Sequence, residues 1–267
     1  MFRRRNPDAV RLLPSLLLLA VPGLAPAQNG GAAKVPFGAG ESLVYNVKYG
    51  PLTVGSGRMD VVGIDTVRGH PAWHLRLEVR AGIPGFRVLN VLESWLDVKT
   101  LVALRYRQET NNGGKEERRL VEMFPDRGVY QETDWRMRKD KAGLQENRRP
   151  EAEMSAQPLD QASFLFFART IPLELGQTYS FNRYYKPPNN PVTLTVLRRE
   201  AVSVPAGRFN AVVIRPVFTS RGIFGQGGKA QVWFTDDDRR LMVRMESQVA
   251  FGSITLQLSE FQGGARP

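Results

Sequence analysis

The sequence predicts an all-β protein in which a large curved antiparallel sheet, or an open β-barrel, surrounds one buried helix at about 158–171. Apolar and polar residues alternate with a period of two in many segments, which is typical of half-buried strands. Clusters rich in Gly, Pro and Asn, such as 111–114 and 186–191, separate these segments as turns. This spacing predicts roughly ten to twelve strands.

One strand indicates what the sheet encloses. In the stretch 86–98, Val91 and Trp95 fall on one face, while Leu92 falls on the other. A strand that is apolar on both faces has to be covered on both. We therefore expect an apolar element to pack inside the curve of the sheet.

The segment 158–171 is the candidate for that element. Pro158 suits a first helical turn, and the run Phe164, Leu165, Phe166 and Phe167 makes the middle apolar nearly all round. Such a helix is buried. Each large side chain contributes ~1.5–3 kcal/mol on full burial, against a net domain stability of ~5–15 kcal/mol, so the helix should belong to the core.

The N-terminal residues 1–27 have the three parts of a secretory signal peptide: arginines, an apolar run, and "APA" at 25–27 as a cleavage site. The apolar run is too short to span ~30 Å of hydrocarbon and is interrupted by Pro14 and Pro22. We expect export to the periplasm or cell envelope, with no transmembrane span in the mature chain. Residues 28–39 read as a flexible lead and 263–267 as a tail.

The charge is strongly basic. The chain of 267 residues carries a formal net charge of +11, and loss of residues 1–27, with four arginines and one aspartate, leaves +8. This balance favours anionic partners such as phospholipid headgroups, lipopolysaccharide or acidic glycans, or it serves solubility alone. The chain has no cysteine, so it forms no disulfide.

Residues 40–262 read as a single β-rich domain with two similar halves, 40–134 and 176–262. The stretch 40–49 resembles 176–185, and 94–107 resembles 232–245. Between the halves lie the helix and the polar stretch 136–157, which we interpret as an exposed insertion or linker, or as an arm that contacts anions.

A Gly-Ile-X-Gly loop occurs once in each half, as "GIPGF" at 82–86 and "GIFGQ" at 222–226. A pseudo-twofold axis along a barrel would bring Ile83 and Phe86 to the same rim as Ile223 and Phe224. Apolar tips on one rim would suit an apolar ligand or a membrane face. The alternative is that they tuck inward and close the barrel floor.

Motifs for catalysis or metal binding are missing from the sequence. His70 and His74, four apart on one strand, would be ~13 Å apart, which is too far to share a metal. The aspartates at 236–238 lack the Gly and distant Glu of a calcium loop and suit a turn. Without cysteine or a Gly-x-Ser-x-Gly motif, the common thiol and elbow-serine nucleophiles are excluded. We expect no cofactor, no metal and no nucleic-acid partner.

Aromatic residues are weaker indicators of a ligand site. Trp95 and Trp233 lie in matching segments of the two halves and are candidate ligand contacts, although tryptophans on strands more often pack in a core.

Several stretches taken together resemble the family of exported bacterial proteins designated domain of unknown function 3108. They are "FGAGESLVYNVKYG", "VGSG", "ESWLD", "LDQASFLFFART", "LELGQTY", "VPAGRFNAVVIRP" and "VWFTDDDRRLMVRM", in this order over residues 37–262. The resemblance implies an all-β domain of the envelope and assigns no catalytic residues.

The favoured hypothesis is an envelope protein that binds an apolar or amphipathic anion, such as a lipid, or an envelope protein partner, at the concave side of the sheet. Two alternatives stay open. One is an enzyme that uses carboxylates on envelope glycans, for which the sequence gives no support; the other is a scaffold in an envelope assembly.

Overall fold

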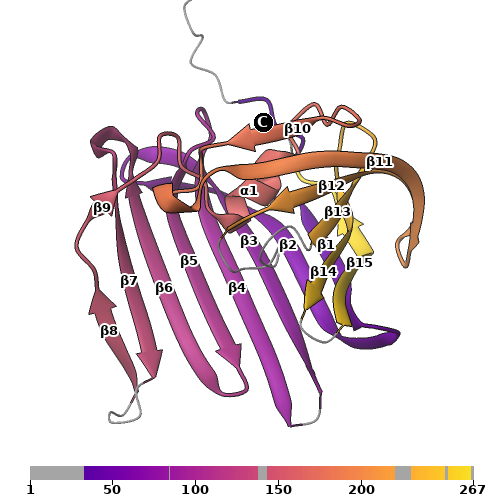
Figure 1. Cartoon of the computed structure of the whole chain (residues 1–267), viewed down its shortest axis with the longest axis horizontal. Coiled ribbons are helices and arrows are strands. Elements are labelled where there is room, and N and C mark those ends of the chain that lie inside the picture. Colours follow the sequence, from indigo (N-terminus) through magenta and orange to yellow (C-terminus); the bar gives the residue numbers. More distant parts are fainter. Residues whose placement is uncertain (1–32, 84, 138–142, 220–229, 250–251, 266–267) are drawn as a thin grey trace, which may run out of the picture. The chain divides into compact units, whose positions relative to one another are not determined.

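The computed structural model describes residues 33–83, 85–137, 143–219, 230–249 and 252–265. The signal peptide expected at 1–27 and the loop residues Ile223 and Phe224 lie outside these ranges. Within them, fifteen strands join in one sheet with one α-helix (Figure 1). The strands are β1 (Ser42–Tyr49), β2 (Leu52–Val67), β3 (His70–Ile83), β4 (Phe86–Asp97), β5 (Ala103–Asn112), β6 (Lys115–Phe124), β7 (Val129–Met137), β8 (Leu144–Arg148), β9 (Ala152–Glu153), β10 (Thr178–Phe181), β11 (Val192–Val204), β12 (Gly207–Val217), β13 (Ala230–Thr235), β14 (Met242–Val249) and β15 (Gly252–Gln262).

The sheet is antiparallel throughout and open. Its order is β10-β11-β12-β13-β14-β15-β1-β2-β3-β4-β5-β6-β7-β8, and β9 pairs with β7 beside β8. From β1 to β8 and from β10 to β15 each strand pairs with the next one in the chain, and the pairing of β15 with β1 joins the two series. This confirms the predicted large antiparallel sheet with an open edge. The polar stretch 136–157 supplies the edge strands β8 and β9.

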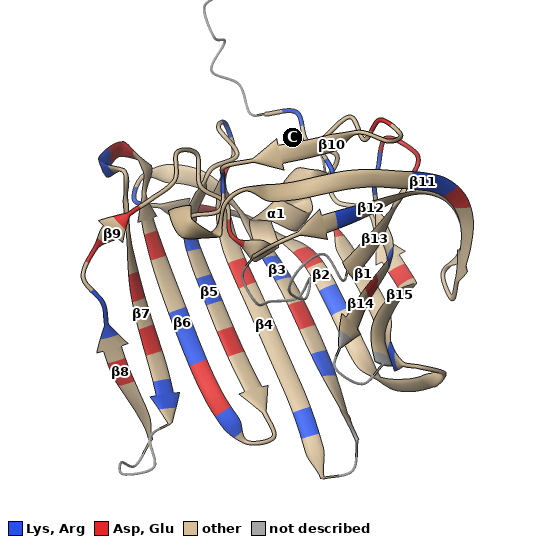
Figure 2. Ribbon diagram, viewed as in Figure 1, with Lys and Arg blue, Asp and Glu red and all other residues tan. Residues whose placement is uncertain are grey.

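The outer face of the sheet is covered by long charged side chains. Figure 2 shows acidic and basic residues distributed along β3 to β7. On β4, the buried Glu93 lies 3.3 Å from His74 Nε2, 3.7 Å from Arg76 and 3.6 Å from Arg107. Because the apolar stems of such arginines shield their neighbours, Val91 is buried on this face as well.

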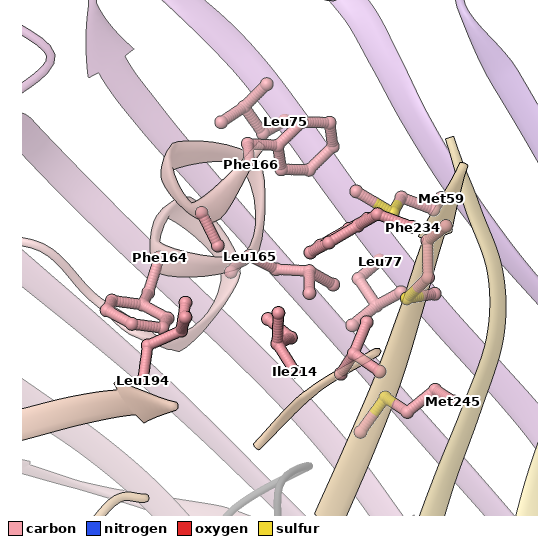
Figure 3. Close-up of a cluster of buried hydrophobic side chains, with 14 of the residues drawn as sticks. Met59, Leu75, Leu77, Phe164, Leu165, Phe166, Leu194, Ile214, Phe234 and Met245 are labelled. Carbon is pink, nitrogen blue, oxygen red and sulfur yellow. The ribbon is translucent and has the colours of Figure 1, made fainter. Parts of the chain in front are cut away.

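The inner face is covered by helix α1 (Gln161–Ala168). In Figure 3, Phe164, Leu165 and Phe166 point from the helix toward strand residues of both halves. Each of the three is at most 2% exposed. Those strand residues include Leu75, Leu77, Leu194, Ile214 and Phe234. The prediction of an apolar helix inside the sheet is therefore confirmed.

The predicted helix bounds, 158–171, are too wide. Asp160 has extended backbone and is the N-cap, with Oδ1 accepting from the amides of Ala162 (2.8 Å) and Ser163 (2.9 Å). Leu159 forms a bridge to Tyr184, so Pro158 lies in an extended segment before the cap and not in the first helical turn. Strand-like pairing stops the helix from starting earlier.

The two halves repeat the same local geometry. Gly40 and Gly176 have φ of +81° and +80°, and their amides donate to the carbonyls of Val61 (2.8 Å) and Val196 (3.0 Å). Each valine begins a bulge in its strand pair. Strands β4 and β13 also shift register directly after their tryptophan, Trp95 or Trp233. These matches support the predicted pair of halves.

Candidate functional site

A groove lies at the end of the sheet where the β3–β4 and β5–β6 hairpins turn. Its volume is about 1120 Å³, and it is open to solvent on one side. Val54, Ala81, Val88 and Leu89 form its apolar part. Val54 and Ala81 also pack against the main core, so the groove continues the concave inner face beyond the helix.

Glycines make the groove possible because its walls are largely backbone. A Cβ on Gly55 would lie 1.9 Å from the carbonyl oxygen of Arg80, on the neighbouring strand β3. Gly113, in the β5–β6 turn, has φ of +60°, and a Cβ there would lie 2.5 Å from the ring of Phe86. Gly55 brings β2 and β3 together more closely than any other residue type allows, and Gly113 has a left-handed backbone conformation that favours glycine.

The charge in the groove is positive. Arg80 and Arg87 line it, and none of its lining residues is acidic. Arg80 pairs with Glu78, which Arg76 also contacts at 2.6 Å. Burial opposes ionisation of Glu78, but hydrogen bonds from Arg80 and Arg76 outweigh it and lower the pKa of this carboxyl. Arg87 forms no ion pair with a described residue. Strand alternation starts its side chain, like that of Arg80, on the outer face opposite Ala81 and Val88, so it can reach a ligand only at the edge of the groove.

The residues predicted as ligand contacts fall in different places. Phe86 is the first residue of β4, 48% exposed, and its ring lies across Gly113 beside the groove. Ile83 is the last residue of β3. The structure brings neither tryptophan to the groove.

Trp95 and Trp233 occupy matching sites on the opposite face of the sheet. Their indole N–H groups donate to Asp65 (2.9 Å) and Glu200 (2.7 Å), two strands away in each case. The guanidinium carbons of Arg105 and Arg244 lie 5.6 and 4.8 Å from the respective rings. The tryptophans are only 9% and 4% exposed, so little ring surface is free for a ligand.

Sequence reasoning did not single out Val54, Gly55, Arg80, Ala81 or Arg87 as groove residues. They come from three strands, β2, β3 and β4, and only their closeness in space makes a site. The short stretch "VGSG" at 54–57 and the glycines of "GIPGF" were the available signal, because both place small residues where strands end.

The acidic groups nearest to a catalytic arrangement are Glu132 and Asp134 on β7. Both are buried, and both lie near the same cations: Arg119 Nε is 3.5 Å from Glu132 and 3.0 Å from Asp134, and Arg149 is 3.5 and 2.7 Å away. Burial acts to raise the pKa of Asp134, but Arg119 and Arg149 lower it overall. An ionised, fully paired carboxylate is a poor general acid.

Neither histidine joins a metal site in the described part of the chain. His74 contacts Asp65 (3.2 Å) and Glu93 (3.3 Å), while His70 lies 3.8 Å from Asp97. Across the same residues, no three His, Asp or Glu side chains are grouped to hold an ion. None of the helices seen there has the length and apolarity to cross a bilayer.

Comparison with known proteins identifies the family of the chain. The family model described as "Protein of unknown function (DUF3108)" matches residues 44–259. The chain belongs to the DUF3108 family. The resemblance seen in the sequence is thus confirmed. No curated protein matches this DUF3108 chain.

One solved structure has the same fold class. A β-barrel-like protein of domain of unknown function DUF1849 from Brucella abortus has a TM-score of 0.50 at 9% identity, covering 87% of this chain and all of the other. A candidate lipoprotein from Parabacteroides distasonis (TM-score 0.30, 10% identity, 85% and 98% covered) is less similar. So is a candidate exported protein with a YmcC-like fold from Bacteroides fragilis (TM-score 0.27, 13% identity, 87% and 100% covered).

Proposed function

We propose that this DUF3108 protein binds an amphipathic anion in the groove and acts without catalysis. The observation that carries the proposal is the lining of the groove, where apolar side chains adjoin Arg80 and Arg87 and no acid is present. An acyl chain would cover Val54, Ala81 and Val88, and its anionic head would extend past the edge of the groove to Arg87, whose side chain starts on the outer face. Burying apolar area gives affinity, and the cation selects the head.

The size of the groove suits such a ligand. Small-molecule sites commonly measure ~300–1,000 Å³, and this groove holds about 1120 Å³. Its open side admits a ligand longer than the groove itself. A closed core at the same place would have supported a scaffold instead.

The ligand should be one found outside the cytoplasm. The arginines, apolar run and small-residue site within residues 1–27 favour export to the envelope. Phospholipids and other acylated anions are abundant there, and a mature charge of about +8 favours their approach.

The test is titration with lysophosphatidylglycerol, followed by calorimetry and by the shift in melting temperature. Arg87→Glu should weaken binding at least tenfold, since a charge that attracted the head now repels it. Arg208→Glu is the matched control, because Arg208 is exposed on β12, outside the groove; it should bind as the wild type does.

A second variant tests the apolar part. Ala81→Phe should fill the groove and abolish binding, and circular dichroism checks that the free variant is folded, since Ala81 also packs against the core. If lysophosphatidylglycerol binds all three variants equally, or binds none of the proteins including the wild type, the proposal is wrong.

A further inference from the structure

The groove opens at an end of the sheet that has unusual surface chemistry. The hairpins that turn there include β1–β2, β3–β4, β5–β6 and β7–β8, because every second turn of a consecutive antiparallel series lies at the same end (Figure 1). We define the hairpin rim as the two strand residues on each side of these turns. Its described members include Lys48, Tyr49, Leu52, Phe86, Arg87, Lys115, Glu116, Arg136 and Met137.

The rim exposes large apolar side chains. It holds four of the eight most exposed large hydrophobic residues in the described ranges, each on a different strand: Tyr49 (41%), Leu52 (64%), Phe86 (48%) and Met137 (54%). Their clustering at the hairpin turns, away from the core, is unfavourable in water unless another surface covers them.

The rim is also basic. Its charged residues are Lys48, Arg87, Lys115 and Arg136 against the single acid Glu116. Figure 2 shows basic residues at the lower ends of β6 and β7. Lys48, Arg87 and Lys115 form no ion pair with any described residue, whereas Arg136 lies 3.8 Å from both Glu117 and Asp134. Most of this charge is therefore open to a partner.

Apolar tips beside unpaired cations match the surface of an anionic bilayer. Tyrosine and apolar side chains enter the interfacial region, and lysine and arginine stay at the level of the phosphates. We propose that the hairpin rim docks on a membrane that contains anionic phospholipid. The proposal goes beyond the groove, since Leu52 and Lys115 do not line it, and it would let a lipid enter the groove directly from the bilayer.

The experiment is co-sedimentation of the full protein, purified as the bacterial host processes it, with two kinds of vesicle. One is phosphatidylcholine alone, and the other is an equal mixture of phosphatidylcholine and phosphatidylglycerol. The wild type should sediment with the mixed vesicles only, and added salt should release it, because the Debye length falls to about 3 Å at 1 M.

Matched substitutions on the same strand locate the contact. Leu52→Asp, on the rim, should reduce vesicle binding about tenfold or more, by loss of an apolar contact and addition of a negative charge. Ile64→Asp, near the other end of β2 with 51% exposure, makes a similar change away from the rim and should leave binding unchanged. Lys115→Glu should weaken binding about fivefold or more, and Arg208→Glu should not.

Three results would overturn the proposal: no sedimentation of the wild type with mixed vesicles, equal sedimentation with both kinds, or equal losses in Leu52→Asp and Ile64→Asp. The first result would favour a protein, in place of a membrane, as the partner of the rim. The groove-filling Ala81→Phe variant separates the two proposals, because it should still bind vesicles while it no longer binds lysophosphatidylglycerol.

Discussion

Arg169 is a fully buried charge whose hydrogen-bond partners come from two distant parts of the chain. Its guanidinium donates to both carboxylate oxygens of Glu41, at 2.6 and 3.0 Å, and to the carbonyl of Arg239 at 2.9 Å. It follows α1 directly, so it ties the helix to the start of β1 and to the β13–β14 turn. A planar guanidinium suits this bidentate contact, which lysine could not reproduce.

Removing one member of this pair should be costly. Glu41→Gln leaves the Arg169 charge buried without a counter-charge, and we expect a loss of about 3–5 kcal/mol in the free energy of unfolding. Arg58→Met, which breaks the largely exposed pair with Asp60, should cost no more than about 1 kcal/mol. Urea unfolding measures both; equal losses would contradict the assignment of Arg169 and Glu41 as a buried pair.

Asp160 should make stability depend on pH. Burial raises its pKa from 3.8 to about 6, although hydrogen bonds from Ser94 and Ser163 oppose the rise. The folded state therefore holds this proton more tightly than the unfolded state. The stabilisation is complete below about pH 4 and is lost as the pH rises through about 6.

The measurement is the free energy of unfolding of the wild type minus that of Asp160→Asn, from pH 3 to pH 7. Asparagine keeps a good N-cap but does not titrate, so the difference should fall across that interval. For Asp134→Asn we expect the opposite pH dependence of this difference. Because the pKa of Asp134 is lowered in the folded state, its stabilisation is present above its unfolded pKa and is lost as the pH falls. A flat difference for Asp160→Asn would refute the raised pKa.

At the level of elements, α1 fills the space inside the sheet, and its residues contribute unequally. Phe166 is 1% exposed and meets the Phe37 ring edge-on at 5.4 Å. Phe166→Ala should lower the free energy of unfolding by about 3–5 kcal/mol. Phe167 is only partly buried, so Phe167→Ala should cost clearly less. Chemical denaturation of the two variants compares them directly, and the reverse order would contradict the packing seen here.

The same helix shows what the sequence could and could not predict. Its apolar run, from Ala162 to Ala168, was evident from composition. Its start was not, because Pro158 and Leu159 suit a first helical turn equally well, and the bridge from Leu159 to Tyr184 decides against it. Strands β8 and β9 escaped prediction because an edge strand can be polar on both faces and then leaves no alternation to read.

The groove was beyond sequence reasoning for a related reason. The alternation in β3 and β4 correctly gives the faces of Ala81 and Val88. What makes the site is the approach of Gly55 to Arg80 and of Gly113 to Phe86, and these contacts depend on sheet register and coiling. For the tryptophans, the sequence pattern clearly assigned Trp95 and Trp233 to strands. It did not show that polar and charged neighbours cover the face of the sheet on which they lie.

At the scale of the molecule, the segments 40–134 and 176–262 are joined by sheet pairing and by the helix. β1 pairs with β15 along its full length, from Ser42 opposite Gln262 to Tyr49 opposite Ile254. Helix α1 contacts both sides: Asp160 accepts from Ser94 of β4 at 2.6 Å, and Phe164 meets Phe218 at 4.9 Å. Neither half can unfold without exposing the inner face of the other.

We therefore expect the halves to unfold as one cooperative unit. In native-state hydrogen exchange at increasing urea, the most protected amides of β1, β4, β13 and β15 should open with one free energy, equal to that of global unfolding. The edge strand β8, paired with β7 over five positions and otherwise unpaired, should open at lower cost. If β1 to β6 and β11 to β15 instead formed two classes that differ by more than about 1 kcal/mol, each half would be a separate folding unit, and the β1–β15 seam and the helix would not couple them.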